Sequence, residues 1–70
     1  MKRQTVSSSN LKSVGYDTQS QVLEIEFQNG HIYQYYGVPS EVYEELMSAS
    51  SHGRYFNAHI RGAYLYRRVK

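Results

Sequence analysis

The sequence contains no cysteine, no tryptophan, only one proline and no long run of apolar residues. Without cysteine, no disulfide can cross-link the chain and no thiolate can bind a metal ion. Without a long apolar run, no segment is suited to span a membrane, and the first ten residues lack the apolar stretch of a signal peptide. These absences predict a soluble, cytoplasmic protein. Its 70 residues allow a single domain.

Acidic residues are also absent from the C-terminal part of the chain. Residues 1–45 carry three lysines or arginines and six acids, whereas residues 46–70 carry five basic side chains and no acid. This asymmetry indicates a polyanionic partner for the C-terminal segment. The alternative is that folding brings an acidic helix beside the basic segment, so that the two neutralise each other.

Two strands joined by a hairpin are predicted from the stretch QVLEIEFQNGHIYQYY, residues 21–36. The length of the turn decides which residues are inside. A two-residue Asn-Gly turn would place Tyr33 and Tyr35 opposite glutamates. A three-residue loop with a left-handed Gly30 shifts the register by one residue and collects all the apolar side chains on one face. We therefore expect that loop, with Phe27 opposite His31, and a core role for both tyrosines rather than base stacking.

Further elements are predicted on either side of this hairpin. Residues 10–17 alternate as a strand, residues 38–50 and 50–62 have the pattern of two helices, and residues 63–70 alternate again. Residues 1–5 are expected to be a flexible tail before a single domain of residues 6–70. The fold class is therefore α+β, with the order β-β-β-α-α-β and both helices on one face of an antiparallel sheet.

Capping residues set the predicted ends of the helices. Ser40 is a candidate cap of the first helix, and Ser50 or Ser51 of the second, while Gly62 suits the end of the second helix. Phe56 and Ile60, four residues apart, mark the buried side of the second helix.

Five segments of the chain resemble, in order, the KTSC domain, a family named for its occurrence at the C-terminus of some lysyl-tRNA synthetases. The segments are SVGYD, LEIEFQNGHIYQYYGVP, VYEEL, SHGRYFNAHIR and YLYRR, and the match spans residues 6–69. The family's motifs fall on Tyr33 and Tyr35, on Gly53, Tyr55, Phe56 and Asn57, and on Tyr64 and Tyr66. The family also occurs as short proteins, mostly of bacteria or phages. The resemblance implies no established activity, and the attachment to a synthetase suggests RNA binding.

The candidate binding residues are the basic side chains of the acid-free segment and one tyrosine among them. Basic side chains would neutralise phosphates, and an exposed ring would stack on unpaired bases of RNA or another nucleic acid. The alternative for Tyr64 and Tyr66 is core packing, which we favour for these rings. The alternative function is a protein-interaction module with a protein partner. The predicted nucleic-acid-binding residues are Arg54, Arg61, Arg67, Arg68, Lys70 and Tyr66.

Catalysis is not predicted. The three histidines fall on different predicted elements, and no Ser–His pair has an orienting carboxylate. The same scatter predicts no metal site, and no glycine-rich loop is present to hold a cofactor phosphate. Glu24 and Glu26 alternate with apolar residues of a strand and are expected to be solvent-facing, solubilising charges.

Overall fold

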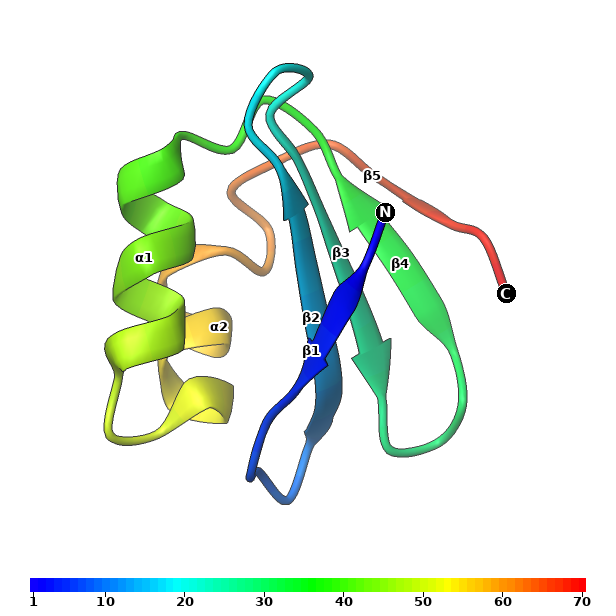
Figure 1. Ribbon diagram of the computed structural model, residues 1–70. Helices are drawn as coiled ribbons and strands as arrows, with labels where there is room; N and C mark the ends of the chain where they lie inside the picture. Colours follow the sequence, from blue (N-terminus) through cyan, green and yellow to red (C-terminus); the bar gives the residue numbers. More distant parts are fainter.

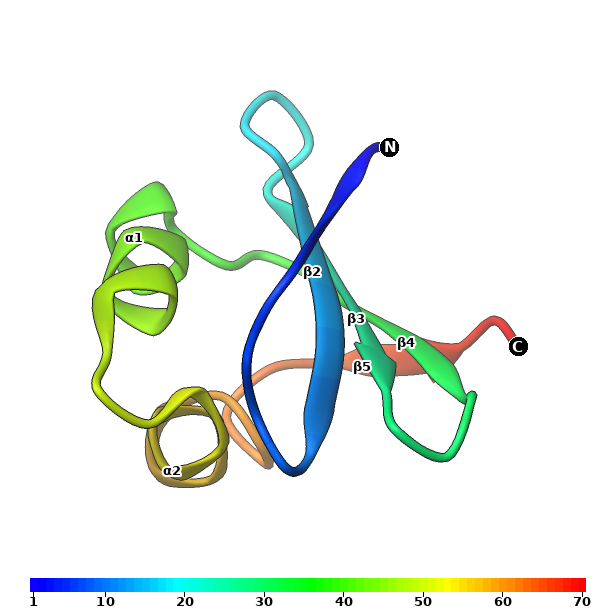
Figure 2. The same cartoon turned by 60° about the horizontal axis from the view of Figure 1, so that its bottom comes forward.

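The computed structural model describes residues 1–70, the whole chain. Five strands form one antiparallel sheet in the order β1-β2-β3-β4-β5, and two helices lie on the same side of it (Figures 1 and 2). The elements are β1 (Arg3–Thr5), β2 (Leu11–Asp17), β3 (Val22–Phe27), β4 (Ile32–Tyr35), α1 (Ser40–Ser48), α2 (His52–His59) and β5 (Tyr66–Arg68). The α+β class is confirmed, with one strand more than the predicted order. No helix has the length and apolar character needed to cross a membrane.

The additional strand is β1, in the segment expected to be a flexible tail. It pairs antiparallel with β2, with Arg3 opposite Gly15. A Cβ atom on Gly15 would lie 2.9 Å from the carbonyl oxygen of Lys2 and 3.0 Å from Cγ of Arg3, so the absence of a side chain permits this close approach. Residues 3–5 contain no apolar alternation, which is why the sequence pattern did not indicate a strand there.

The hairpin between β3 and β4 has the three-residue loop that the sequence predicts. The backbone N–H of Phe27 donates to the carbonyl oxygen of His31 at 2.9 Å, and Gly30 has a φ of 91°. Leu23 is consequently opposite Tyr35, and Ile25 is opposite Tyr33. The register is confirmed, and both tyrosines lie on the apolar face of the sheet.

The two helices begin differently. Ser51 caps α2, because its hydroxyl oxygen accepts a hydrogen bond from the backbone N–H of Arg54 at 3.3 Å. The prediction that Ser40 caps α1 is wrong: Pro39 occupies the N-cap position, no side chain caps the helix, and Ser40 is its first residue. The ring of Pro39 holds φ at −64°, and its ψ of 152° makes the backbone extended where it enters the helix. No side chain forms a capping hydrogen bond there.

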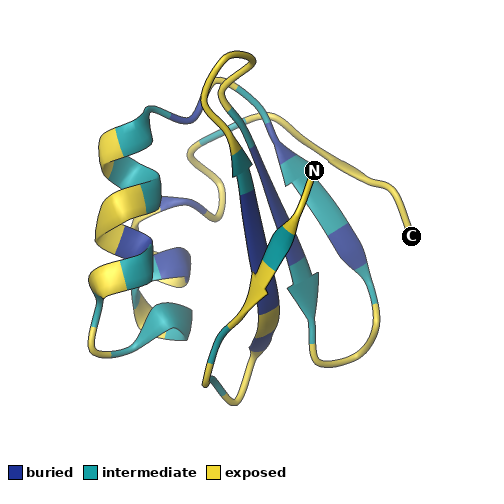
Figure 3. Cartoon of the chain, in the orientation of Figure 1, coloured by how far each residue is buried: buried dark blue, intermediate teal, exposed yellow.

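The core lies between the sheet and the helices (Figure 3). Phe56 and Ile60 are buried, as predicted, and they meet apolar residues of β2, β3 and β4 together with Leu46 of α1. Gly62, with a φ of 78°, lies in the turn that follows α2. The remaining members of the buried cluster are Leu11, Val14, Leu23, Ile25, Tyr35 and Val38.

The opposite face of the sheet carries a polar network centred on Glu24. This residue is only 8% exposed, so the prediction of a solvent-facing charge is wrong for it. Its carboxylate pairs with Arg3 of β1 and accepts a hydrogen bond from the Gln34 amide at 2.9 Å. Desolvation opposes ionisation of Glu24, but these hydrogen bonds and the charge of Arg3 together outweigh it and lower the pKa of the carboxyl.

We expect Phe56→Ala to destabilise the protein by about 3–5 kcal/mol, because truncation of a buried aromatic ring leaves a cavity. At roughly 0.05–0.15 kcal/mol per residue, a chain of 70 residues has only about 4–10 kcal/mol of stability in total, so this loss removes a large part of it. Chemical denaturation followed by circular dichroism measures the loss. Leu65→Ala is the control, since Leu65 is 82% exposed. Equal midpoints for the two variants would contradict the buried position of Phe56.

We expect the stability of the folded protein to fall in acid as Glu24 becomes protonated. Because folding lowers the pKa of this carboxyl, its contribution to stability is present above its ordinary pKa of 4.5 and is lost as the pH falls through the folded value. We therefore expect Glu24→Gln to lower the melting temperature at pH 7 and to reduce the further drop between pH 7 and pH 3. Glu44→Gln, on the exposed side of α1, is the matched control and should behave as the parent protein does.

Candidate functional site

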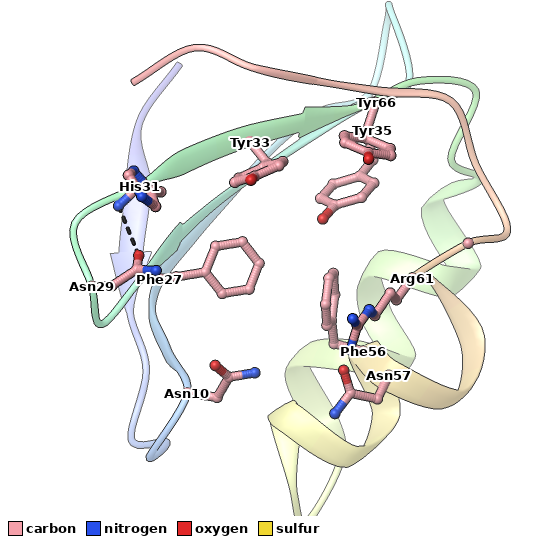
Figure 4. Close-up of a pocket in the computed structure, with 11 residues that line it drawn as sticks. Asn10, Phe27, Asn29, His31, Tyr33, Tyr35, Phe56, Asn57, Arg61 and Tyr66 are labelled. Carbon is pink, nitrogen blue, oxygen red and sulfur yellow. Dashed lines mark hydrogen bonds between the residues drawn. The ribbon is translucent and has the colours of Figure 1, made fainter.

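An aromatic pocket of about 450 Å³ opens between the sheet and α2 (Figure 4). Its walls come from four elements, of which β3 and β4 precede α1 in the sequence and α2 and β5 follow it. Phe27 is at the end of β3, Tyr33 and Tyr35 are on β4, Phe56 is on α2, and Tyr66 begins β5. The hairpin register places the two β4 tyrosines in this wall, and the pairing of β5 with β4 sets Tyr66 opposite Tyr35.

The two phenylalanine rings meet the tyrosine rings of β4 edge-on. The Phe56 ring meets Tyr35 at a centroid distance of 5.5 Å and an interplanar angle of 74°, and Phe27 meets Tyr33 at 5.6 Å and 87°. The Tyr66 ring lies 5.6 Å from that of Tyr33 and 5.7 Å from that of Tyr35, and the residue is 59% exposed. The pocket therefore has a packed interior and one open aromatic ring at its edge.

Tyr35 has two roles in this arrangement. Its side chain belongs to the buried core, with 5% exposure, and its hydroxyl points into the pocket, where it bonds to no protein atom (Figure 4). Burial raises the pKa of Tyr35 to about 12, and the neighbouring phenols of Tyr33 and Tyr66 add to the effect. At neutral pH the hydroxyl keeps its proton and can donate a hydrogen bond to a bound group.

Polar side chains surround the mouth of the pocket. Asn10 precedes β2, Asn57 is on α2, Arg61 follows α2, and His31 begins the segment that leads into β4 (Figure 4). The side chains of Asn10, Asn57 and Arg61 form no hydrogen bond with the residues around them, and no acidic residue lines the pocket. The mouth thus offers amide donors and acceptors and a positive charge.

A second, wholly polar recess of about 420 Å³ adjoins the first. Asn10 and Asn57 line both, so the two recesses meet along these amides. Arg54 at the start of α2 lines only the second recess, together with the hydroxyl-rich segment of residues 7–9. Arg54 and Asn57 are three residues apart on α2 and so share one face of the helix, while Arg61 lies two residues beyond its end.

The structure divides the basic residues predicted to bind nucleic acid. Arg61 and Tyr66 line the aromatic pocket, and Arg54 lines the polar recess. Arg68 is opposite Tyr33 and so shares the pocket face of the sheet, whereas Arg67 is opposite Gln34 on the other face. Lys70 lies beyond β5, where its carbonyl oxygen accepts a hydrogen bond from the N–H of Ile32 at 3.0 Å.

None of these five cations forms an ion pair within the chain. The salt bridges join only Arg3 with Glu24 and Glu26, across the far face of the sheet. Helix α1 packs beside α2, so an acidic helix does lie next to part of the basic segment, but the acids of α1 form no ion pair with its cations. Glu45 of α1 instead accepts a hydrogen bond from the Tyr55 hydroxyl at 2.7 Å.

The histidines occupy three separate environments. His31 lines the pocket, the Nδ1 atom of His52 lies 2.8 Å from the carbonyl oxygen of Leu46, and the ring of His59 lies 4.5 Å from that of Tyr55. No group of three or more histidines, aspartates or glutamates is close enough to hold a metal ion.

Sequence reasoning missed part of the pocket. Phe27 and Phe56 were assigned to the core alone, and Asn10 and Asn57 were not among the candidate binding residues. Asn57 belongs to the Gly-x-Tyr-Phe-Asn motif of the resemblance, and an exposed polar residue within such a motif was the available signal. Nothing in the sequence around Asn10 indicated a binding role, because only the tertiary structure brings this residue to the pocket.

Comparison with known proteins identifies the family of the chain. The model of the KTSC domain matches residues 7–64. The chain belongs to the KTSC domain family. A crystal structure of a KTSC domain protein from Yersinia pestis superposes with a TM-score of 0.94 and 46% sequence identity, over 99% of this chain and 97% of that one.

Relatives of this KTSC protein include small proteins and a segment of larger ones. An uncharacterised protein of Stutzerimonas stutzeri is 51% identical over 81% of this chain and 80% of its own length. A lysine–tRNA ligase of Nostoc sp. is 41% identical over 84% of this chain, but the match covers only 10% of the ligase.

We expect the stability of the folded protein to fall in alkali because of the buried phenol of Tyr35. Because folding raises the pKa of this phenol from 10.0 to about 12, its contribution is fully present below pH 10 and is lost as the pH rises towards 12. Tyr35→Phe retains the ring and removes a hydroxyl without a protein partner. We therefore expect a small change in melting temperature at pH 7 and a smaller loss of stability between pH 10 and 12 than in the parent. An unchanged alkaline loss would contradict this role.

Proposed function

We propose that this KTSC protein is a non-catalytic module that binds RNA or another nucleic acid through the face that carries the aromatic pocket. The observation that carries the proposal is the aromatic pocket itself, which is lined by both the exposed Tyr66 and Arg61 and by no acidic residue. Aromatic rings that stack on bases, combined with cations that neutralise phosphates, are the usual components of single-strand binding surfaces.

Charge supports the proposal independently of the pocket. Residues 46–70 have five cations and no acid, and none of these cations forms an ion pair within the chain. Such a surface attracts a polyanion and gains free energy from counterion release when it contacts phosphates. The lysine–tRNA ligase relatives carry a matching segment in proteins named for a reaction on tRNA, which favours RNA among the polyanions.

A protein-interaction module is the second candidate function, and the exposed edge of the sheet favours it. β5 is the last strand of the sheet, and the exposed apolar side chains beside it are Leu65 and Val69, at 82% and 41% exposure. An edge strand has unpaired backbone groups that an extended peptide can join. The basic side chains of β5 favour an acidic peptide in this position.

A matched pair of charge reversals tests nucleic-acid binding. Arg61→Glu changes the pocket face, whereas Arg67→Glu makes the same change in net charge on the opposite face of the sheet. We expect Arg61→Glu to weaken binding of single-stranded RNA much more than Arg67→Glu does, as measured by fluorescence anisotropy at low salt. Equal effects would mean that net charge alone attracts the RNA.

The salt dependence of the parent protein gives a second measure. The log–log slope of affinity against salt is about −0.7 for each phosphate contact on a single strand, so three contacts on the pocket face predict a slope of about −2. If no RNA or DNA shifts any amide resonance of residues 54–70 at low salt, nucleic-acid binding is excluded. An acidic peptide that shifts β5 resonances would then support the protein-interaction module.

A further inference from the structure

The aromatic pocket and the polar recess beside it form one path along α2, and the two recesses suit different parts of a nucleotide chain. The pocket has apolar aromatic walls, while the recess is lined by polar residues only. A base has an apolar face and a polar edge, whereas the sugar-phosphate backbone is polar and charged. The change in lining from one recess to the other matches this division.

The boundary between the recesses is marked by two free amides. Asn10 and Asn57 lie at the mouth of the pocket and line both recesses (Figure 4). An asparagine amide can donate and accept together, which matches the edge of an unpaired base, adenine above all. Deeper in the pocket, the hydroxyl of buried Tyr35 provides a further donor without a protein partner.

Cations lie on either side of these amides. Arg54 is three residues before Asn57 on α2, and Arg61 is four residues after Asn57, just beyond the end of the helix, so the order along the chain is cation, amide, cation. Arg54 lines the polar recess and Arg61 lines the aromatic pocket, so the two arginines lie on the two sides of the boundary that Asn10 and Asn57 mark. A strand that places one base in the pocket would therefore pass a positive charge on each side of that base.

From this arrangement we infer that the aromatic pocket accepts one unpaired nucleobase, whose edge contacts Asn10 and Asn57 while Arg54 and Arg61 meet the flanking phosphates. The inference rests on the proposed function and adds the ligand class: single-stranded nucleic acid with an accessible base, in preference to a duplex. In a duplex the bases are stacked and paired, and their faces are not available to the pocket. Basic residues outside this path, such as Arg67, are not part of the site.

The test compares oligonucleotides that differ in their bases but not in their charge. The probes are single-stranded DNA hexamers of adenine, cytosine or thymine, and an abasic hexamer with the same phosphates. Stacking on an aromatic side chain is worth roughly fivefold to a hundredfold in affinity per base. We therefore expect at least one base-bearing hexamer to bind about tenfold or more tightly than the abasic one, with amide shifts at residues 29–35 and 56–62.

Three variants test whether the difference in affinity between base-bearing and abasic hexamers arises in the pocket. Tyr66→Ala removes the open ring and should weaken binding of the base-bearing hexamers while leaving the abasic hexamer unchanged. Asn57→Ala should alter the order of affinity among the three bases. Gln19→Ala, which removes an exposed amide in the turn between β2 and β3, is the control and should change neither.

The outcomes separate the two proposals. If the abasic hexamer binds as tightly as the others, with a salt-dependent affinity, the nucleic-acid function stands and the base pocket is overturned. If base-bearing hexamers bind more tightly but Tyr66→Ala and Asn57→Ala have no effect, bases are bound elsewhere and the pocket is again overturned. If no hexamer binds, abasic or not, the proposed function itself fails.

Discussion

The three-residue loop between β3 and β4 sets the face on which the tyrosines of β4 lie, and the pocket depends on that placement. Gly30 adopts a left-handed conformation that other residues rarely tolerate, and the hydrogen bond from Phe27 to His31 closes the loop. A register shift of one residue would turn Tyr33 and Tyr35 to the polar face beside Glu24. The aromatic core and the pocket wall would then lose the same two rings.

Helix α2 contributes residues both to the hydrophobic core and to the candidate site. Phe56 is buried among Phe27 and Tyr35 and is also a wall of the pocket, while Asn57 of the same helix and Arg61, just beyond its end, lie at the mouth. The pocket is therefore held by residues that the fold requires. Its walls are fixed by core packing, and the side chains at its rim remain free to contact a ligand.

Charged side chains on the two faces of the sheet have different partners. On the outer face, Arg3, Glu24 and Gln34 satisfy one another through an ion pair and a hydrogen bond. On the helix side, the basic residues near the pocket have no acidic partner. This contrast is the main electrostatic reason to place the proposed binding function on the pocket face, because unpaired cations retain their affinity for an external anion.

Local features of the sequence determined the elements and their faces. Alternation predicted the strands, the requirement that the apolar side chains of both strands share one face predicted the hairpin register, and the spacing of Phe56 and Ile60 predicted the buried side of α2, because each of these signals involves residues near one another in the chain. Tertiary structure alone decided that residues 3–5 form a strand, that Glu24 is buried, and that Arg61 and Arg67 lie on different surfaces. It also brought Asn10 beside Asn57. These outcomes depend on strand pairing and helix packing between distant segments, and local periodicity contains no information about which distant segments meet.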